Sequence, residues 1–248
     1  MKRLVTIAAY LMVLVLAGVS SLKSAEPGKI PGKATVRTVV GPATYTKAGG
    51  GSDKLKANQV LEAGDSITTG PDAYVYLSVN GVTSAVRIGA ETTLVLKTME
   101  NTGPGREGTT DTSLDLKIGT IQGQVKKVTG DSKYEISTPH GVAGIRGTDF
   151  SVEVTANGNG TYTVTFISIS GTVVASAVVN GQLQTKTLSG GESWTVGGDV
   201  VPVPVQILQT LEQWIAELVS VVYGFNPGPV PIGPIHPRPQ PGGGSPSG

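Results

Sequence analysis

Between residues 34 and 200 the chain consists of short runs in which apolar and polar residues alternate, and each run stops at a turn signal. The clearest turn signals are the Asn-Gly pairs at 80–81 and 180–181 and the Gly-Asn-Gly sequence at 158–160. Alternation with period two is typical of a strand with one buried face, and an Asn-Gly pair between two such runs predicts a tight hairpin. The 35 glycines and the 5% share of aromatic residues also favour many short strands over a helical bundle.

We therefore predict an all-β body over residues 34–200, built as a compact roll or short solenoid, or as a sandwich, of about a dozen short strands. The polar segment 100–113 is expected to be a loop between two of the strands.

One pattern, L-x-x-G-[DE]-S-[IW]-T-x-G, occurs twice, at residues 61–70 and 188–197. Each copy follows a strand that runs into a glycine, Gly41 in the first case and Gly171 in the second. Asp65 and Glu192 occupy the same position in the two copies, where a carboxylate typically accepts backbone N–H groups of a turn. The repetition indicates two similar structural units. Independent occurrence of a common turn sequence is the alternative.

The most unusual segment of the chain is TPHGVAGIRGTDF at residues 138–150. Its proline lacks a backbone N–H and fits a strand entrance or a turn. Its three glycines, spaced by three residues, allow positive φ angles or a close approach of another backbone. We predict a structural role for this segment. The residues assigned to it are Thr138, Pro139, Gly141, Gly144, Arg146, Gly147, Thr148 and Phe150.

Arg146 lies between Ile145 and Gly147, which is an unusual setting for a solvated arginine. Its guanidinium carries five donors and can bond several backbone carbonyls where the chain bends. We expect it to be a buried structural staple, with a ligand-binding arginine as the alternative. A nucleotide loop is excluded, because the spacing G-x-x-G-x-x-G differs from the phosphate-binding patterns and the following FSVEV alternates like a strand.

Residues suited to catalysis or metal binding are sparse, so we expect no enzyme, no cofactor and no metal site. His140 and His236 are the only histidines, and there is no cysteine. Ser137, Ser151 and Asp149 surround His140 in sequence without the context of a nucleophile. Asp65 and Glu192 are better explained as turn caps than as an acid/base pair. The acidic residues Glu107, Asp111 and Asp115 lack a calcium-loop spacing.

The N-terminus has the features of a secretory signal peptide, which we assign to residues 1–25. Lys2 and Arg3 precede an uncharged run over residues 4–19, and small residues follow up to Ala25. This run is shorter than the ~20 residues that span a bilayer, and a retained membrane anchor is the alternative. Residues 26–33 are expected to be a Pro/Gly-rich linker. We predict a periplasmic or secreted protein, with membrane contact only if the N-terminal segment is uncleaved.

The C-terminal residues follow a different pattern. Residues 203–224 place apolar side chains at helical spacing, so they predict an amphipathic helix that begins near Pro204 and ends at Gly224. We expect this helix to pack on the β body, with partner docking as the alternative. Residues 225–248, rich in proline and glycine, are expected to be a disordered tail.

Taken together, the motifs resemble the periplasmic domain of the FecR family, named after the ferric-citrate regulator. They are LEAGDSITTG at 61–70, YLSVNG at 76–81, the TP…AGIRGTDF segment, and the closing LSGGE at 188–192. The resemblance covers about residues 34–200. It implies an all-β domain outside the cytoplasmic membrane. Only three residues precede the apolar segment, so we expect the chain to lack the cytoplasmic sigma-binding part of the best-known members and to resemble the stand-alone exported members.

We therefore expect an exported, non-catalytic module that binds a protein or polysaccharide component of the bacterial envelope. The alternative is a membrane-anchored sensor related to FecR-type control of sigma factors and iron uptake. Nucleic acid is not an expected partner, because the net charge is +1 and no basic stripe occurs.

Overall fold

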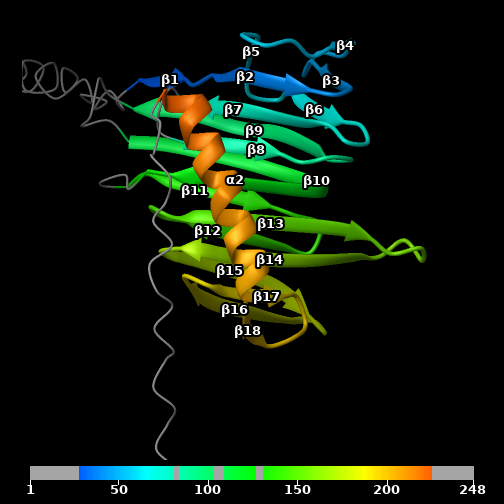
Figure 1. Cartoon of the computed structure of the whole chain (residues 1–248), viewed down its shortest axis with the longest axis vertical. Helices are drawn as coiled ribbons and strands as arrows, with labels where there is room; N and C mark the ends of the chain where they lie inside the picture. The colour runs from blue at the N-terminus through cyan, green and yellow to red at the C-terminus, as the bar shows by residue number, and fades with distance from the viewer. Residues whose placement is uncertain (1–27, 81–83, 103–108, 127–130, 225–248) are drawn as a thin grey trace, which may run out of the picture.

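The computed structural model describes residues 28–80, 84–102, 109–126 and 131–224. These residues form an all-β body with a single C-terminal helix, as the sequence predicts (Figure 1). In the first half the strands are β1 (Lys29–Pro31), β2 (Ala34–Val40), β3 (Ala43–Thr46), β4 (Ser52–Lys54), β5 (Val60–Leu61), β6 (Ser66–Thr69), β7 (Tyr74–Val79), β8 (Ser84–Ile88) and β9 (Thr93–Thr102). In the second half they are β10 (Thr109–Val125), β11 (Lys133–Ser137), β12 (Gly141–Ile145), β13 (Asp149–Ala156), β14 (Tyr162–Ser170), β15 (Thr172–Val179), β16 (Gln182–Ser189), β17 (Glu192–Thr195) and β18 (Val200–Pro202).

The strands make two layers, which we call sheet A and sheet B. Sheet A has the order β4-β3-β6-β9-β10-β11-β12-β15-β16, with β1 also paired to β9. Sheet B has the order β5-β2-β7-β8-β10-β13-β14-β17-β18. All of these pairings are antiparallel except β10 with β11.

The long strand β10 belongs to both sheets, and this shows how the roll is built. Residues 109–118 pair in sheet A, and residues 119–125 pair in sheet B. The corner is Gly119, whose φ is 92° and whose Cβ, if present, would lie 2.2 Å from the Thr92 hydroxyl. A side chain is therefore excluded at this corner. Left-handed glycines also occur where the chain passes between the sheets at Gly41, Gly64, Gly147, Gly171 and Gly191.

The two repeated units of the sequence have matching geometry. Gly41 and Gly171 both have a φ of 74° at the corner between sheets. Asp65 accepts the backbone N–H of Glu62 at 3.0 Å, and Glu192 accepts that of Ser189 at 2.8 Å. Each carboxylate therefore caps the turn that precedes it, as predicted, and the similarity extends beyond a shared turn sequence.

The inward faces of the two sheets form one hydrophobic core. Trp194 and Phe166 stack in it at a ring-centroid distance of 6.2 Å, and both side chains are fully buried. The Trp194 indole donates a hydrogen bond to the carbonyl of Gly198 at 3.1 Å, which satisfies its polar group inside the core.

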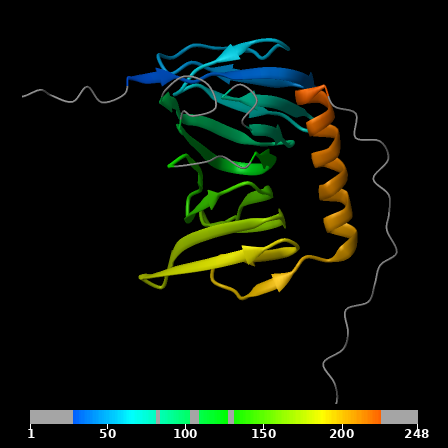
Figure 2. The same ribbon diagram turned by 90° about the vertical axis from the view of Figure 1, so that its left-hand side faces the viewer.

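The helix α2 (Val205–Tyr223) lies across the outer face of sheet B (Figure 2). It buries Leu211, Ile215, Leu218 and Val222, which pack with Tyr76, Ala85 and Ile169 of the sheet. Gly224 ends the helix in the left-handed conformation with a φ of 66°. The predicted helix and its packing on the β body are confirmed. The outer face of sheet A has no such helix among the described residues.

Two sequence predictions about connecting segments are wrong. Residues 29–31, expected within the linker 26–33, form β1, which pairs with the end of β9 and carries a Lys29–Glu100 ion pair at 2.8 Å. The expected loop 100–113 is shorter, because β9 continues to Thr102 and β10 begins at Thr109. The first error arises from pairing with a distant strand and the second from extension of the β9–β10 hairpin into a polar segment, and local composition reports neither.

The predicted signal peptide, the predicted disordered tail and His236 lie outside the described residues. Within the described ranges, the structure contains no helix that is long and apolar enough to cross a membrane.

Candidate binding site at the glycine-rich motif

The motif begins as a tight turn between β11 and β12. The backbone N–H of Thr138 donates to the carbonyl of Gly141 at 2.8 Å, and the Thr138 hydroxyl donates to the same carbonyl at 2.8 Å. The N–H of Gly141 in turn donates to the Thr138 hydroxyl at 3.0 Å. Pro139 lies in the middle of this turn, where a missing N–H costs nothing. Pro139 therefore lies in a turn, one of the two settings expected for it.

The three glycines of the motif have three different environments. A Cβ on Gly141 would lie 2.8 Å from the Ser176 carbonyl oxygen and 3.3 Å from the Phe166 ring, so this glycine allows a close approach of strands. Gly147 has a φ of 62° at the corner between sheets A and B. Gly144 has neither constraint, because its φ is not positive and a Cβ would meet only the Val174 carbonyl oxygen, at 3.8 Å. The fold therefore does not require a glycine at position 144.

The prediction that Arg146 is a buried staple is wrong. Residues 141–145 are a regular strand, and its alternation turns Arg146 outward, where it is exposed. The staple is Thr148, which is 2% exposed. Its hydroxyl is 2.8 Å from the carbonyl oxygen of Thr172 and 3.1 Å from that of Arg146, and it accepts the N–H of Thr172 at 3.3 Å. The backbone of Thr148 also bonds Val125 of β10 in both directions.

Phe150 ends the motif inside the core. Its ring is fully buried and lies 6.2 Å from the ring of Tyr134. A Cβ on Gly123 would come within 2.6 Å of the Phe150 ring, so the phenyl group occupies the space that Gly123 leaves. The structural role predicted for Phe150 is consistent with this packing.

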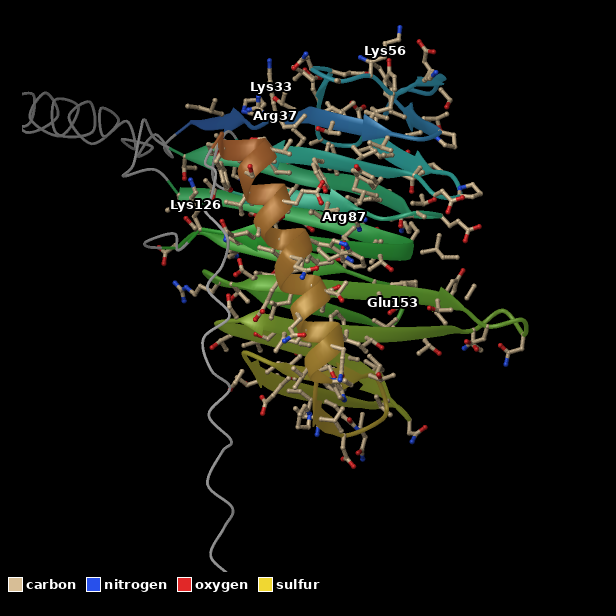
Figure 3. The ribbon with its side chains drawn as sticks, in the orientation of Figure 1. Lys33, Arg37, Lys56, Arg87, Lys126 and Glu153 are labelled. Carbon is tan, nitrogen blue, oxygen red and sulfur yellow. The ribbon has the colours of Figure 1, made fainter. Side chains whose placement is uncertain are left out.

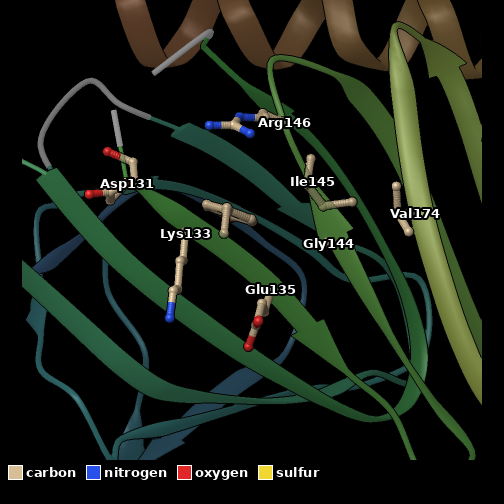
Figure 4. Close-up of a pocket in the computed structure, with 9 residues that line it drawn as sticks. Asp131, Lys133, Glu135, Gly144, Ile145, Arg146 and Val174 are labelled. Atoms are coloured by element: carbon tan, nitrogen blue, oxygen red, sulfur yellow. The ribbon is translucent and has the colours of Figure 1, made fainter. Parts of the chain in front are cut away.

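The outward half of the motif lines an open hollow on the outer face of sheet A, with a cavity volume of about 640 Å³ (Figure 4). Its lining residues come from the segment before β11, from β11, from the end of β12 and from β15. The set is Asp131, Ser132, Lys133, Tyr134, Glu135, Gly144, Ile145, Arg146 and Val174. We call this set the motif hollow.

The register of sheet A explains the shape of the motif hollow. Glu135 of β11 and Val174 of β15 are the two cross-strand partners of Gly144. Gly144 has no side chain, whereas its neighbours Glu135 and Val174 on either side both have one, so the backbone of β12 is exposed at the floor of the hollow. Charges of both signs stand around it, with Lys133 and Arg146 as cations and Asp131 and Glu135 as anions.

A smaller depression of about 380 Å³ lies at the other end of β12. It is lined by the Thr138–Gly141 turn and by Val178 and Leu183. The His140 ring lies near it and contacts the Tyr162 ring at a centroid distance of 6.1 Å. The two depressions leave the outer face of sheet A open along β12 and β15.

The other residues weighed for chemistry do not converge on one place. Asp149 accepts bonds from Gln124 at 3.0 Å and from Ser170 at 2.8 Å on sheet B. His140 lies at the β11–β12 turn on sheet A, and Asp65 and Glu192 hold separate turns. No group of three or more histidine, cysteine, aspartate or glutamate residues with metal-binding geometry occurs among the described residues.

A polar cluster under α2 escaped the sequence analysis. The Arg87 guanidinium of β8 lies 4.5 Å from the Trp214 ring and bonds Gln122 at 2.9 Å (Figure 3). Burial, together with the hydrogen bond and negative charge of Glu217, raises the pKa of the Tyr76 phenol. The cross-strand pair Tyr76–Arg87 could have signalled this cluster, but only once the β7–β8 hairpin register was known. The cluster fixes α2 to sheet B.

Comparison with known proteins gives a family for the central part of the chain. The family model described as FecR protein matches residues 65–174, fewer than half of the 248 residues. The matched segment includes the whole motif at residues 138–150 and every lining residue of the motif hollow. No curated protein matches the chain.

Two solved structures of a candidate anti-sigma factor from Parabacteroides distasonis ATCC 8503 are similar at low identity. One has 12% identity and a TM-score of 0.45, and the match covers 60% of this chain and 64% of that chain. The other has 11% identity and a TM-score of 0.46, with coverage of 64% and 74%. The chain thus spans less than two thirds of the first of these structures.

Proposed function

Because residues 65–174 form a FecR domain, we propose that this protein is an exported, non-catalytic FecR-type module that binds another protein of the bacterial envelope through the motif hollow. A FecR domain supports a regulatory or signalling role of the FecR type. Export, the binding role and the site belong to the proposal.

The observation that carries the proposal is Gly144. A glycine inside a strand costs about 0.5–1 kcal/mol relative to alanine, and here neither a φ angle nor a close contact requires it. A strand glycine without a local reason is typical of a place where a ligand or another backbone approaches closely. The partner would approach sheet A at this bare stretch of β12.

The surroundings of Gly144 favour a protein over a glycan as the partner. Beside the bare backbone of Gly144 the hollow offers the aliphatic side chain of Val174, which is 43% exposed. Tyr134, the aromatic residue of the hollow, is only 5% exposed, so it offers no ring face on which a sugar could stack. Charges of both signs around an exposed aliphatic side chain resemble the polar rim of a protein interface.

Site-specific photo-cross-linking tests this proposal. A photoreactive amino acid replaces Val174 in the full chain, expressed in the source bacterium, and the matched control places it at Thr163, exposed on the outer face of sheet B. We expect one protein adduct of defined mass from position 174 and none from position 163. Equal labelling from both positions, adducts to glycan only, or no adduct at position 174 would reject the proposal.

Export is tested separately by N-terminal sequencing of the protein from cell fractions. A mature start near residues 21–26 in the periplasm or medium supports it. An intact N-terminus in the membrane fraction would instead support the anchored sensor.

A further inference from the structure

Among the described strands that end the two sheets, all but one are short. β1 and β4 of sheet A and β5 and β18 of sheet B have three, three, two and three residues. The remaining edge is β16, with eight residues, which pairs only with β15 among the described strands. Proteins usually blunt such edges, because an unpaired strand is a template for another strand.

The β15–β16 hairpin shows which backbone groups of β16 face outward. Its two-residue turn, Asn180-Gly181, has φ angles of 52° and 76°, so residues 179 and 182 form a hydrogen-bonded pair. Hydrogen-bonded and non-bonded pairs alternate in an antiparallel ladder. The N–H and C=O groups of Leu183, Thr185 and Thr187 therefore point away from β15, toward the free edge.

The same edge carries the most exposed large apolar side chains among the described residues. Leu183 is 72% exposed, and its cross-strand partner Val178 is 63% exposed. Both side chains lie on the outer face of sheet A beside the unpaired backbone. An exposed aliphatic pair next to free backbone groups is typical of a strand that receives a partner strand.

We propose that β16 is a homodimer interface, in which the β16 strands of two copies of this chain pair antiparallel and join their A sheets. A two-fold axis at Thr185 places Leu183 opposite Thr187, and Gln184 opposite Lys186, of the partner subunit. The outward N–H and C=O groups of Leu183, Thr185 and Thr187 then form hydrogen bonds with the outward groups of the same three residues in the second copy.

Two features of β16 favour a second copy with this register. β16 is the longest strand that ends a sheet, so a second β16 matches it along its whole length. Lys186 is the one charged residue of β16, and an axis at Thr185 sets it against Gln184 rather than against a second lysine. An axis at Lys186 would oppose like charges, so this residue also excludes the neighbouring register. The motif hollow lies on β11, β12 and β15 and stays open in this dimer.

Sedimentation velocity of the purified full chain over a dilution series, with two variants, tests the proposal. Thr185→Pro removes an N–H that points outward and leaves the ladder to β15 intact, so we expect loss of the dimer with little change in melting temperature. Thr185→Val keeps the N–H, and we expect it to keep the dimer. Proline at Thr185 that leaves the dimer unchanged, or a wild-type chain that stays monomeric at every concentration, overturns the proposal.

A disulfide provides a second, independent readout of the register. The chain has no cysteine, so Thr185→Cys introduces a single thiol. Residues that face each other at the axis of a hydrogen-bonded pair have Cα atoms about 5.5 Å apart, within disulfide range. We expect oxidation to convert T185C into a covalent dimer and to leave a matched T163C control monomeric. Equal dimer yields from both variants would overturn the register.

Discussion

The role of Thr148 can be tested by removing its hydroxyl group without changing its shape, with the substitution Thr148→Val. The hydroxyl can donate one proton, to the carbonyl of Thr172 or of Arg146, and it accepts the N–H of Thr172. The substitution therefore removes two simultaneous hydrogen bonds at a position that is 2% exposed. A neutral hydrogen bond contributes about 0.5–1.5 kcal/mol, and a buried group left without a partner costs about 1–3 kcal/mol. We expect Thr148→Val to lower the free energy of unfolding by about 2–3 kcal/mol.

Urea unfolding followed by the fluorescence of buried Trp194 measures this loss. The matched control is Thr46→Val at an exposed position, for which we expect a change within about 0.5 kcal/mol. Arg146→Ala is expected to behave like the control, because its side chain is exposed. The assignment of the staple to Thr148 fails if Arg146→Ala destabilises the protein more than Thr148→Val does.

Three further predictions follow from the described contacts. Gly141→Ala is expected to lower the free energy of unfolding by about 1–3 kcal/mol, because the new methyl group meets the Ser176 carbonyl oxygen. Gly144→Ala is expected to leave it unchanged or to raise it by up to about 1 kcal/mol. Equal shifts in the melting temperature of the two variants would contradict this prediction. Leu218→Ala removes a fully buried contact between α2 and sheet B, so we expect it to lower the free energy of unfolding, measured in urea, by about 2–5 kcal/mol. A loss below about 0.5 kcal/mol would show that the helix is not firmly packed. Burial, with a smaller effect of the Asp149 charge, raises the pKa of Tyr223 from 10.0 to about 12. The unfolded chain therefore releases this proton first, so stability is expected to be full below pH 10 and to fall as the pH rises toward 12. Unfolding at stepped alkaline pH should show a shallower fall for Tyr223→Phe, and an unchanged slope would contradict the assignment.

The local part of the fold could be predicted from the sequence because turn chemistry acts over a few residues. The Asn180-Gly181 pair predicted its hairpin, and the equivalent positions of Asp65 and Glu192 in the repeated pattern predicted two similar turn caps. The β1 strand could not be predicted, since its only stabilising partner, β9, is about seventy residues away in sequence. The division of the strands into two sheets also depends on such distant pairing.

The candidate site was predicted in part. The three glycines were expected to allow positive φ angles or a close approach of backbone, and this describes Gly147 and Gly141 but not Gly144. Because residues 141–145 are a strand, period-two alternation places Gly144 and Arg146 on the open face and Ile145 in the core. The same alternation, applied to the sequence VAGIR, would have found the exposed arginine. The motif hollow itself required the register with β11 and β15.

The yield of the cross-linked adduct from position 174 in a Gly144→Val background tests the central proposal most directly. Valine at position 144 is compatible with a strand, and its Cβ would lie at an ordinary van der Waals distance of 3.8 Å from the Val174 carbonyl oxygen, so the melting temperature should not fall. The account predicts that the adduct is lost from this stable variant, because the side chain fills the floor on which the partner rests. An undiminished adduct from a folded Gly144→Val protein would contradict it.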